Sequence, residues 1–308
     1  MSERFEVDAP GGLFEFLTSR LPDWNRNTLR QRLRAGCVRV NDDAVLQARH
    51  PLIAGDRVEV VALEEGRPVA VALPGVEVLY EDELLIAIDK PAGLLSVSTE
   101  RQGERERTAL ALVRDALSRP GHPARLWPVH RLDRETSGVL LFARSREACE
   151  EVRAEWSEVH KTYLAIVEGE PRPPAGVIEQ PLWEDRGLNV RVGAHTGAKQ
   201  ARTHYATLAS SRGRALLEVR LDTGRRHQIR AHLAWLGHPI VGDRRYGTPG
   251  PSLGLHALRL ELLHPRHRRP LSFTAAPPHA FSGFDTALPS AGAGELGVPG
   301  GPEGREAP

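Results

Sequence analysis

The first part of the chain combines helical and strand-like patterns of apolar residues. Four apolar side chains recur at the spacing of one helix face, at Leu13, Phe16, Leu17 and Leu21. A second helix is expected over residues 28–35, with Asn27 as its N-cap and Gly36 ending it. Two short alternating strands follow, at 38–41 and 57–60. These elements predict a small α/β domain over residues 11–65.

Strand-like runs dominate the rest of the chain. They lie at residues 76–80, 84–89, 139–144, 163–168, 203–209 and 215–221. Helical faces are expected within 147–159, from Ala148, Val152, Trp156 and Val159, and within 227–236, from Ile229, Leu233 and Leu236. The pattern predicts an α+β chain, in which the small domain precedes a larger one over 76–281. That larger domain is expected to be built on a mixed, largely antiparallel sheet with flanking helices.

Two stretches have a composition that does not support a packed core. Residues 66–75 are rich in Val, Ala, Gly and Pro, which predicts a linker between the two domains. Residues 282–308 are rich in Gly, Pro, Ala and Glu and contain few large apolar side chains. We expect this tail to be disordered.

The composition narrows the class of protein. With 308 residues and 40% hydrophobic content, the chain has room for one large core and one smaller domain. No apolar run approaches the ~20 residues of a membrane span, and Met1–Pro10 lacks a signal-peptide core. Cys37 and Cys149 are far apart and form no metal-like pair. We therefore expect a cytoplasmic protein without disulfides or cofactors.

The charge of the chain is unevenly distributed. The net charge is only +1, but six arginines and a single acid, Asp23, occur between residues 20 and 40. Arg26, Arg30 and Arg34 are spaced four apart and would share one helix face. Such a row suits the phosphates of a nucleic acid, and the alternative is a solvated charged face.

Residues 130–138, His-Arg-Leu-Asp-Arg-Glu-Thr-Ser-Gly, place a carboxylate among basic groups at a corner between two strand-like runs. Thr136, Ser137 and Gly138 supply turn chemistry, so Asp133 is expected to be presented at the corner. The flanking arginines would attract an anionic substrate. From this segment alone, a loop whose aspartate caps its own backbone remains an open alternative.

Four further segments carry recognisable motifs in a fixed order. They are the strand and Lys-Pro-Ala-Gly turn within 80–97, Lys-Thr-Tyr-Leu-Ala within 161–169, Thr-Gly-Arg-Arg-His-Gln-Ile-Arg at 223–230, and His-Pro-Ile-Val-Gly-Asp-Arg-Arg-Tyr-Gly at 238–247. Together with 130–138 they resemble the RluA family of RNA pseudouridine synthases, over residues from about 76 to 275. The resemblance implies the mixed-sheet fold and an isomerase. In its reaction, uracil is cleaved from ribose, turned within the site and rejoined through a ring carbon.

The resemblance also implies roles for three residues. Asp133 matches the catalytic aspartate, Arg230 the arginine that pairs with it, and Tyr163 the tyrosine that stacks on the target base and is a candidate for the last proton transfer. A bidentate pair between Arg230 and Asp133 would offset the cost of burying the carboxylate. The alternatives are an arginine at a helix edge and a tyrosine in cross-strand packing. His227, His232 and His238 lack the spacing of a metal site, so no metal is expected.

A uridine in folded RNA has to be flipped out before it can react. Arg131 matches a family arginine placed to fill the vacated stack. Lys90, Arg225, Arg226 and His227 are expected as phosphate or pocket-wall contacts. The small domain resembles the RNA-binding domain first seen in ribosomal protein S-four, although Asn41-Asp42 stands where Asn-Gly is commoner.

The expected partner is structured RNA, with large-subunit ribosomal RNA as first choice and transfer RNA as the alternative. No membrane and no partner protein are implied, and a monomer is expected. Two other classes stay open. One is an RNA-binding ribosome-assembly factor whose synthase domain is inactive. The other is a hydrolase or glycosidase, for which Glu135 is the one acid near Asp133.

Overall fold

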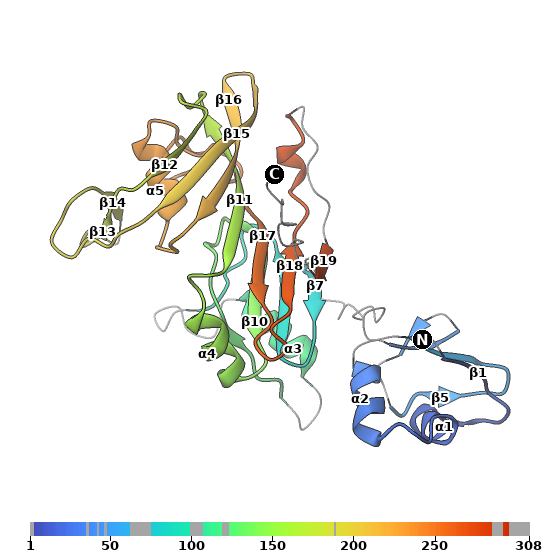
Figure 1. Ribbon diagram of the computed structural model, residues 1–308. Coiled ribbons are helices and arrows are strands. Elements are labelled where there is room, and N and C mark those ends of the chain that lie inside the picture. The colour runs from blue at the N-terminus through green and yellow to red at the C-terminus, as the bar shows by residue number, and fades with distance from the viewer. Residues whose placement is uncertain are drawn as a thin grey trace, which may run out of the picture. The chain divides into compact units, whose positions relative to one another are not determined.

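The computed structural model describes residues 3–34, 37–41, 43–45, 48–61, 75–98, 107–118, 123–187, 189–284 and 292–295 (Figure 1). The chain separates into two compact units, one of residues 1–71 with 80–85 and the other of 72–79 with 86–308. The predicted linker at 66–75 lies outside the described residues except for Gly75.

The N-terminal unit is a small α/β structure. Its strands are β1 (Glu3–Glu6), β2 (Gly11–Gly12), β3 (Val38–Val40), β4 (Asp43–Ala44), β5 (Pro51–Leu52) and β6 (Arg57–Val60). Its helices are α1 (Leu13–Arg20) and α2 (Arg26–Arg34). Four strands pair in the order β1-β6-β3-β4, and β2 pairs with β5. The predicted helix face is buried at Leu13, Leu17 and Leu21, which share one core with Leu29 and Val58.

The second helix begins earlier than its sequence predicted. Helix α2 starts at Arg26, so Asn27 lies inside the helix and is not its N-cap. Asn25 takes that role, because its side-chain oxygen accepts a 2.8 Å hydrogen bond from the amide of Thr28. Two asparagines two residues apart offer the same capping chemistry, and the pattern could not choose between them.

A large mixed sheet forms the centre of the C-terminal unit. Its strands are β7 (Glu77–Glu81), β8 (Leu85–Lys90), β9 (Trp127–Pro128), β10 (Ser137–Ala143), β11 (His160–Glu168), β12 (Ala175–Ile178), β15 (Thr203–Ser211), β16 (Arg214–Leu221), β17 (Leu255–Leu263), β18 (Pro270–Thr274) and β19 (Gly292–Glu295). A separate hairpin joins β13 (Leu182–Glu184) to β14 (Val190–Val192). The helices are α3 (Ala109–Leu117), α4 (Arg146–Ala154) and α5 (Gln228–Trp235), with a 3-10 turn at His279–Phe281.

The strand order of the main path is β12-β15-β16-β11-β17-β10-β8-β7. The pairs β15–β16, β11–β16 and β11–β17 are antiparallel, whereas β10 pairs with β17 in parallel. Strands β10 and β11 are buried along nearly their whole length, as expected for strands covered on both faces. The prediction of an α+β chain with a mixed, largely antiparallel sheet is confirmed.

The parallel pair β10–β17 anchors the chain immediately after the 130–138 corner. Gly138 has a φ of 111°, and a Cβ at this position would overlap the carbonyl oxygen of Ala257 on β17. Only glycine combines this backbone conformation with so close an approach. Beside it, the Ser137 hydroxyl lies 2.9 Å from Nδ1 of His256. The corner is therefore fixed to the middle of the sheet.

Two predicted boundaries differ from the structure. Helix α4 ends at Ala154, not at residue 159, and Trp156 instead stacks on His130 with ring centroids 5.1 Å apart. Trp156 thus packs on an aromatic partner outside the helix and does not extend the predicted helical face. Within the expected disordered tail, Gly292–Glu295 form β19, which pairs antiparallel with β18. Residues 285–291 and 296–308 lie outside the described part of the chain.

Buried His256 makes the stability of the fold depend on pH. Its Nε2 lies 3.1 Å from the carbonyl oxygen of Ala275, which can only accept, so the neutral ring carries its proton there. Burial lowers the pKa of His256 from 6.5 to about 4, against the opposing effect of Ala275. The unfolded chain therefore binds more protons between these values, and stability is lost as the pH falls from 6.5 towards 4.

We expect the free energy of unfolding to fall by about 3 kcal/mol more in the wild type than in His256→Asn over this interval, since each pKa unit corresponds to about 1.4 kcal/mol. Urea denaturation across the pH range measures both slopes. The matched control is His160→Asn at an exposed position, which should keep the wild-type slope. Parallel profiles for wild type and His256→Asn would contradict the assignment.

Candidate active site

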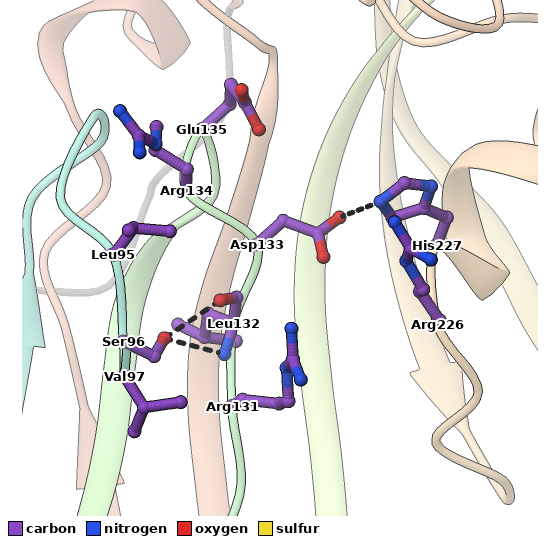
Figure 2. Close-up of a pocket in the computed structure, with 10 residues that line it drawn as sticks. All are labelled: Leu95, Ser96, Val97, Arg131, Leu132, Asp133, Arg134, Glu135, Arg226 and His227. Carbon is purple, nitrogen blue, oxygen red and sulfur yellow. Dashed lines mark hydrogen bonds and ion pairs between the residues drawn. The ribbon is translucent and has the colours of Figure 1, made fainter. Parts of the chain in front are cut away.

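Asp133 lies on a turn that a second loop fixes from behind. The hydroxyl of Ser96 donates to the carbonyl of Leu132 at 2.8 Å and accepts from its amide at 3.0 Å (Figure 2). On the other side of Asp133, the amide of Thr136 donates to the Asp133 carbonyl at 3.2 Å. The corner thus spans Asp133–Thr136, while Ser137 and Gly138 already belong to β10. Its backbone is held, so the Asp133 side chain has a defined direction.

Lys90 supports the same turn from inside the protein. Its side chain is fully buried, and its ammonium donates to the carbonyls of Pro91, Leu94 and Arg134 at 2.9, 2.8 and 3.2 Å. Burial lowers its pKa to about 8, against the opposing charge of Asp133. Lys90 was expected to contact a phosphate or to line the pocket wall. The structure corrects this expectation, because the donors of Lys90 are already used within the fold. The Lys-Pro-Ala-Gly turn ties the corner at Asp133 to β8.

Arg230 reaches Asp133 from helix α5. Its Nη1 donates to Oδ2 of Asp133 at 3.0 Å, and only 7% of the Arg230 side chain is exposed. The predicted bidentate contact is made elsewhere, because Nε and Nη2 both donate at 2.8 Å to the two carboxylate oxygens of Asp243. The guanidinium therefore joins two carboxylates, in a fork to Asp243 and a single bond to Asp133.

The pair between Arg230 and Asp243 is fully inside the protein. Burial opposes the charge on Asp243, but hydrogen bonds from Arg230 and from the amides of Arg245 and Tyr246 outweigh it and hold the pKa of Asp243 below its usual range. Burial likewise opposes the charge on Arg230, and the two carboxylates raise its pKa above the usual value. Both groups stay charged, and each compensates the other in a low-dielectric environment.

His227 lies beside this network at the start of α5. It is the helix N-cap residue and has a left-handed backbone, with φ 51°. Its Nε2 is 3.7 Å from Oδ2 of Asp133, and its Nδ1 is 2.9 Å from the Tyr246 hydroxyl. Burial and the neighbouring arginines lower the pKa of His227, although Asp133 opposes them.

The neutral form of His227 has a preferred tautomer. The Tyr246 hydroxyl accepts a 3.3 Å bond from the amide of Val190, which leaves its proton for Nδ1 of His227. Neutral His227 then carries its own proton on Nε2, the nitrogen that faces Asp133. The carboxylate of Asp133 is thus approached by two N–H groups, one from Arg230 and one from His227.

Tyr163 lies on β11 and is half-buried. Its pKa is raised, first by burial and then by the negative charge of Asp133. The raised pKa keeps the phenol protonated at neutral pH, so its hydroxyl can donate a hydrogen bond.

A cavity of about 130 Å³ opens in front of Asp133. Its wall includes Arg131, Asp133, Arg226 and His227. Figure 2 shows Arg131 on the same side of the turn as the Asp133 carboxylate, while Glu135 points away from it. Arg134 and Glu135 also line the cavity, so its arginines outnumber its carboxylates, which suits a substrate that carries phosphates.

The remaining predicted contacts are found at different places. Arg225 donates to the carbonyl of Gln200 at 3.3 Å and does not line the cavity, while Arg226 lines it and pairs with Glu184 at 2.9 Å. In the N-terminal unit, the guanidinium groups of Arg26 and Arg30 lie 5.2 and 5.3 Å from the ring of Phe14. They share one face as predicted. The side chain of Arg34 lies outside the described part.

Sequence reasoning missed three residues that organise the site. Asp243 and Tyr246 belong to the quoted motif at 238–247, which gave their identity but no role. Ser96 carried no signal at all, because a serine bridging two loops has no sequence pattern. Among the described residues, no group of three His, Cys, Asp or Glu side chains could hold a metal. None of the described helices has the length and hydrophobicity of a membrane span.

The role of Lys90 can be measured as stability. In Lys90→Met the carbonyls of Pro91 and Leu94 lose their donor, whereas that of Arg134 keeps the amide of Gly93 at 2.7 Å. Each buried acceptor left unsatisfied costs about 1–3 kcal/mol, partly offset because no ammonium has to be buried. We expect a loss of about 2 kcal/mol in urea denaturation. The control is Lys199→Met at an exposed site, and an equal effect in both would refute the support role.

Comparison with known proteins finds relatives that match most of the chain. The family model described as RNA pseudouridylate synthase matches residues 84–235. The chain is 34% identical over 270 residues to ribosomal large subunit pseudouridine synthase D of Nitrosomonas europaea, covering 82% of this chain and 77% of that protein. It is 33% identical over 296 residues to the protein of that name from Xylella fastidiosa, covering 88% and 87%.

Solved structures agree with the sequence comparison. Human RNA pseudouridylate synthase domain containing 4 matches with a TM-score of 0.55 and 27% identity, covering 67% of this chain and 90% of that chain. The matched family region contains Asp133, Tyr163 and Arg230, whereas Asp243 and Tyr246 follow it. The chain belongs to the RNA pseudouridine synthase family, and it is by that membership an RNA isomerase.

Proposed function

We propose that this chain converts uridines of large-subunit ribosomal RNA to pseudouridine, with Asp133 as the catalytic residue. The observation that carries the proposal is the position of one inward carboxylate, held by Arg230 at 3.0 Å, in a small cavity rimmed by cations. The names of the relatives from Nitrosomonas europaea and Xylella fastidiosa support ribosomal RNA as the substrate. Transfer RNA is the alternative that the experiment below distinguishes.

Three residues are proposed to carry the reaction, namely Asp133, which lines the cavity, together with Arg230 and Tyr163. The bond from ribose C1′ to N1 of uracil breaks, a bond from C1′ to C5 forms, the proton on C5 leaves and N1 is protonated. Asp133 acts on the ribose, either as a nucleophile at C1′ or as the base that opens a glycal route. In both routes Arg230 orients the carboxylate and compensates its charge before reaction.

The groups around Asp133 handle the uracil and its protons. Tyr163 is assigned to stacking on the flipped base and, once the ring is rejoined, to the proton transfer at C5. Arg230 holds Asp133 by its 3.0 Å hydrogen bond, and Nε2 of His227 stands 3.7 Å from the same carboxylate oxygen.

Arg131 and Arg226 are assigned to the RNA outside the reacting nucleotide. Arg131 is exposed and stands next to the catalytic turn, so it is placed to enter the stack that the flipped uridine vacates. Arg226 presents its guanidinium at the cavity wall, where a phosphate adjacent to the target would lie. These contacts bind backbone and shape and do not read base sequence.

The N-terminal unit is proposed to be an RNA-binding module of the S-four type. Its helix α2 carries Arg26 and Arg30, whose guanidinium groups both lie over the ring of Phe14 and so share one face. Such a row suits an RNA backbone, and its contribution should weaken with salt. The solvated-face alternative would leave RNA affinity unchanged when both arginines are replaced.

Asp133→Asn should abolish pseudouridine formation, because an amide can neither form the ester nor remove the proton. The measurement is pseudouridine mapping of total RNA from cells with and without the gene, rescued by wild type or by Asp133→Asn. We expect particular sites in large-subunit ribosomal RNA to be lost and to return only with wild type. Sites in transfer RNA would replace the substrate assignment, and rescue by Asp133→Asn would favour an inactive assembly factor.

The same rescue separates the isomerase from an enzyme with two acids. Glu135 points away from Asp133, so Glu135→Gln should restore every site that the wild type restores. Loss of all sites with Glu135→Gln would instead support the paired-carboxylate alternative. Purified variants should bind the RNA transcript with wild-type affinity, which shows that they are folded.

Asp243→Asn should slow the reaction, although Asp243 itself does not contact the substrate. It leaves Arg230 without its fork, so the guanidinium can turn and Asp133 loses its orientation. We expect kcat to fall by about a hundredfold with KM nearly unchanged, as for a misplacement of about 1 Å. The assay is release of tritium from C5-labelled uridine in a ribosomal RNA transcript. Asp222→Asn at an exposed ion pair is the control, and equal kcat values would exclude the positioning role.

A further inference from the structure

A second cavity lies beside helix α5, on the side of the β13–β14 hairpin. Its volume is about 590 Å³, much larger than the cavity in front of Asp133. Figure 1 shows the hairpin next to α5. The helix contributes Ala231, Ala234 and Trp235, and the hairpin contributes Trp183 and Arg191. Because the two alanines have small side chains, the helix side of the cavity leaves room for a planar group.

Two indole rings face this cavity. Trp235 is 52% exposed, which is unusual for the largest apolar side chain at the end of a helix. Trp183 stacks on His195 with ring centroids 3.9 Å apart and planes 9° apart, which fixes the indole in one orientation. An exposed ring and a fixed ring at one cavity form a surface on which flat aromatic groups bind by stacking.

The charge of the cavity favours an anion. Arg191 and Arg245 are among its lining residues, and no aspartate or glutamate of the described chain is among them. Arg191 pairs at 3.1 Å with Asp185, which orients it, and 59% of its side chain remains exposed. Trp183 is directly opposite Arg191 in the β13–β14 register, so an indole and a guanidinium stand side by side. A base on the ring and a phosphate on the guanidinium would match this pair.

The cavity is connected to the active site by Tyr246. This residue lines the cavity, its hydroxyl lies 2.9 Å from Nδ1 of His227, and its ring faces the guanidinium of Arg230 at 5.5 Å. Helix α5 therefore presents Arg230 to Asp133 and the next residue, Ala231, to the second cavity. Arg230 and Tyr246 thus separate the Asp133 carboxylate from the two indole rings.

We propose that this cavity binds an unpaired nucleotide close to the target uridine in the same RNA strand, with its base on Trp235 and its phosphate at the arginines. The inference rests on the proposed function, because the flipped uridine at Asp133 brings its neighbours to this surface. A folded protein partner fits less well, since the cavity offers two guanidinium groups and two rings but no continuous apolar face. The site would hold one strand on both sides of Arg230.

The test is binding of a dye-labelled oligouridylate to the full chain, followed by fluorescence anisotropy. Trp235→Ala should weaken binding by about tenfold, while Trp235→Phe, which keeps a ring, should stay within about twofold of wild type. Leu263→Ala removes another exposed apolar side chain, far along β17, and should change nothing. An oligomer of the same length without bases should bind all four proteins equally.

Three results would overturn the proposal. Equal affinity of wild type and Trp235→Ala shows that the ring binds no base. An equal loss on the oligomer without bases shows that the variant acts on the backbone or on the fold. A change of sedimentation with unchanged RNA affinity assigns the face to a second copy of the chain. Each result is independent of pseudouridine mapping, so failure of the proposed function would be recognised separately.

Discussion

The geometry of the candidate site depends on one arginine that is shared by two carboxylates. Asp243 is completely buried, and Nε and Nη2 of Arg230 compensate its charge by forking onto it at 2.8 Å. Each charge of this pair offsets the cost of burying the other. Once it has formed, the guanidinium plane is fixed, and Nη1 is left pointing at Asp133. The direction of the Asp133 carboxylate is thus set by a buried ion pair to which Asp133 itself does not belong.

The backbone of Asp133 is fixed by a different set of contacts. Ser96 holds Leu132, Lys90 holds the loop carbonyls, and Gly138 allows β10 to approach β17 without a side chain between them. Asp133 and Arg230 are 97 residues apart in sequence and meet because β10 and α5 are attached to the same sheet. Their 3.0 Å contact needs both anchors, so loosening either one misplaces the carboxylate. The rigid sheet therefore fixes the position of Asp133 relative to Arg230, which a single loop could not do.

The sequence carried the larger features of this arrangement because they leave periodic or compositional traces. Alternation located the strands, and ordered motifs brought Asp133, Tyr163 and Arg230 together. The sequence could not show how Arg230 divides its donors, because an arginine looks the same in a sequence whether its guanidinium binds one carboxylate or two. Lys90 was misassigned for the same reason: a lysine in a motif suggests an exposed charge, and only the tertiary structure shows three carbonyls around it. The end of α4 was misplaced because the stacking of Trp156 on His130 competes with a helical face and is not local.

The charge state of the site also couples the two ends of the proposed reaction. Burial is the main cause of the raised pKa of Tyr163, and the negative charge of Asp133 adds to it, so the phenol is protonated while the aspartate is free. When Asp133 bonds to ribose or takes a proton, its negative charge is lost and that contribution to the Tyr163 pKa disappears. That loss lowers the Tyr163 pKa, but burial, the larger of the two effects, remains and keeps the phenol protonated. In the proposed reaction the pKa of the phenol is therefore higher before Asp133 reacts than afterwards, which links the acidity of one residue to the charge of the other.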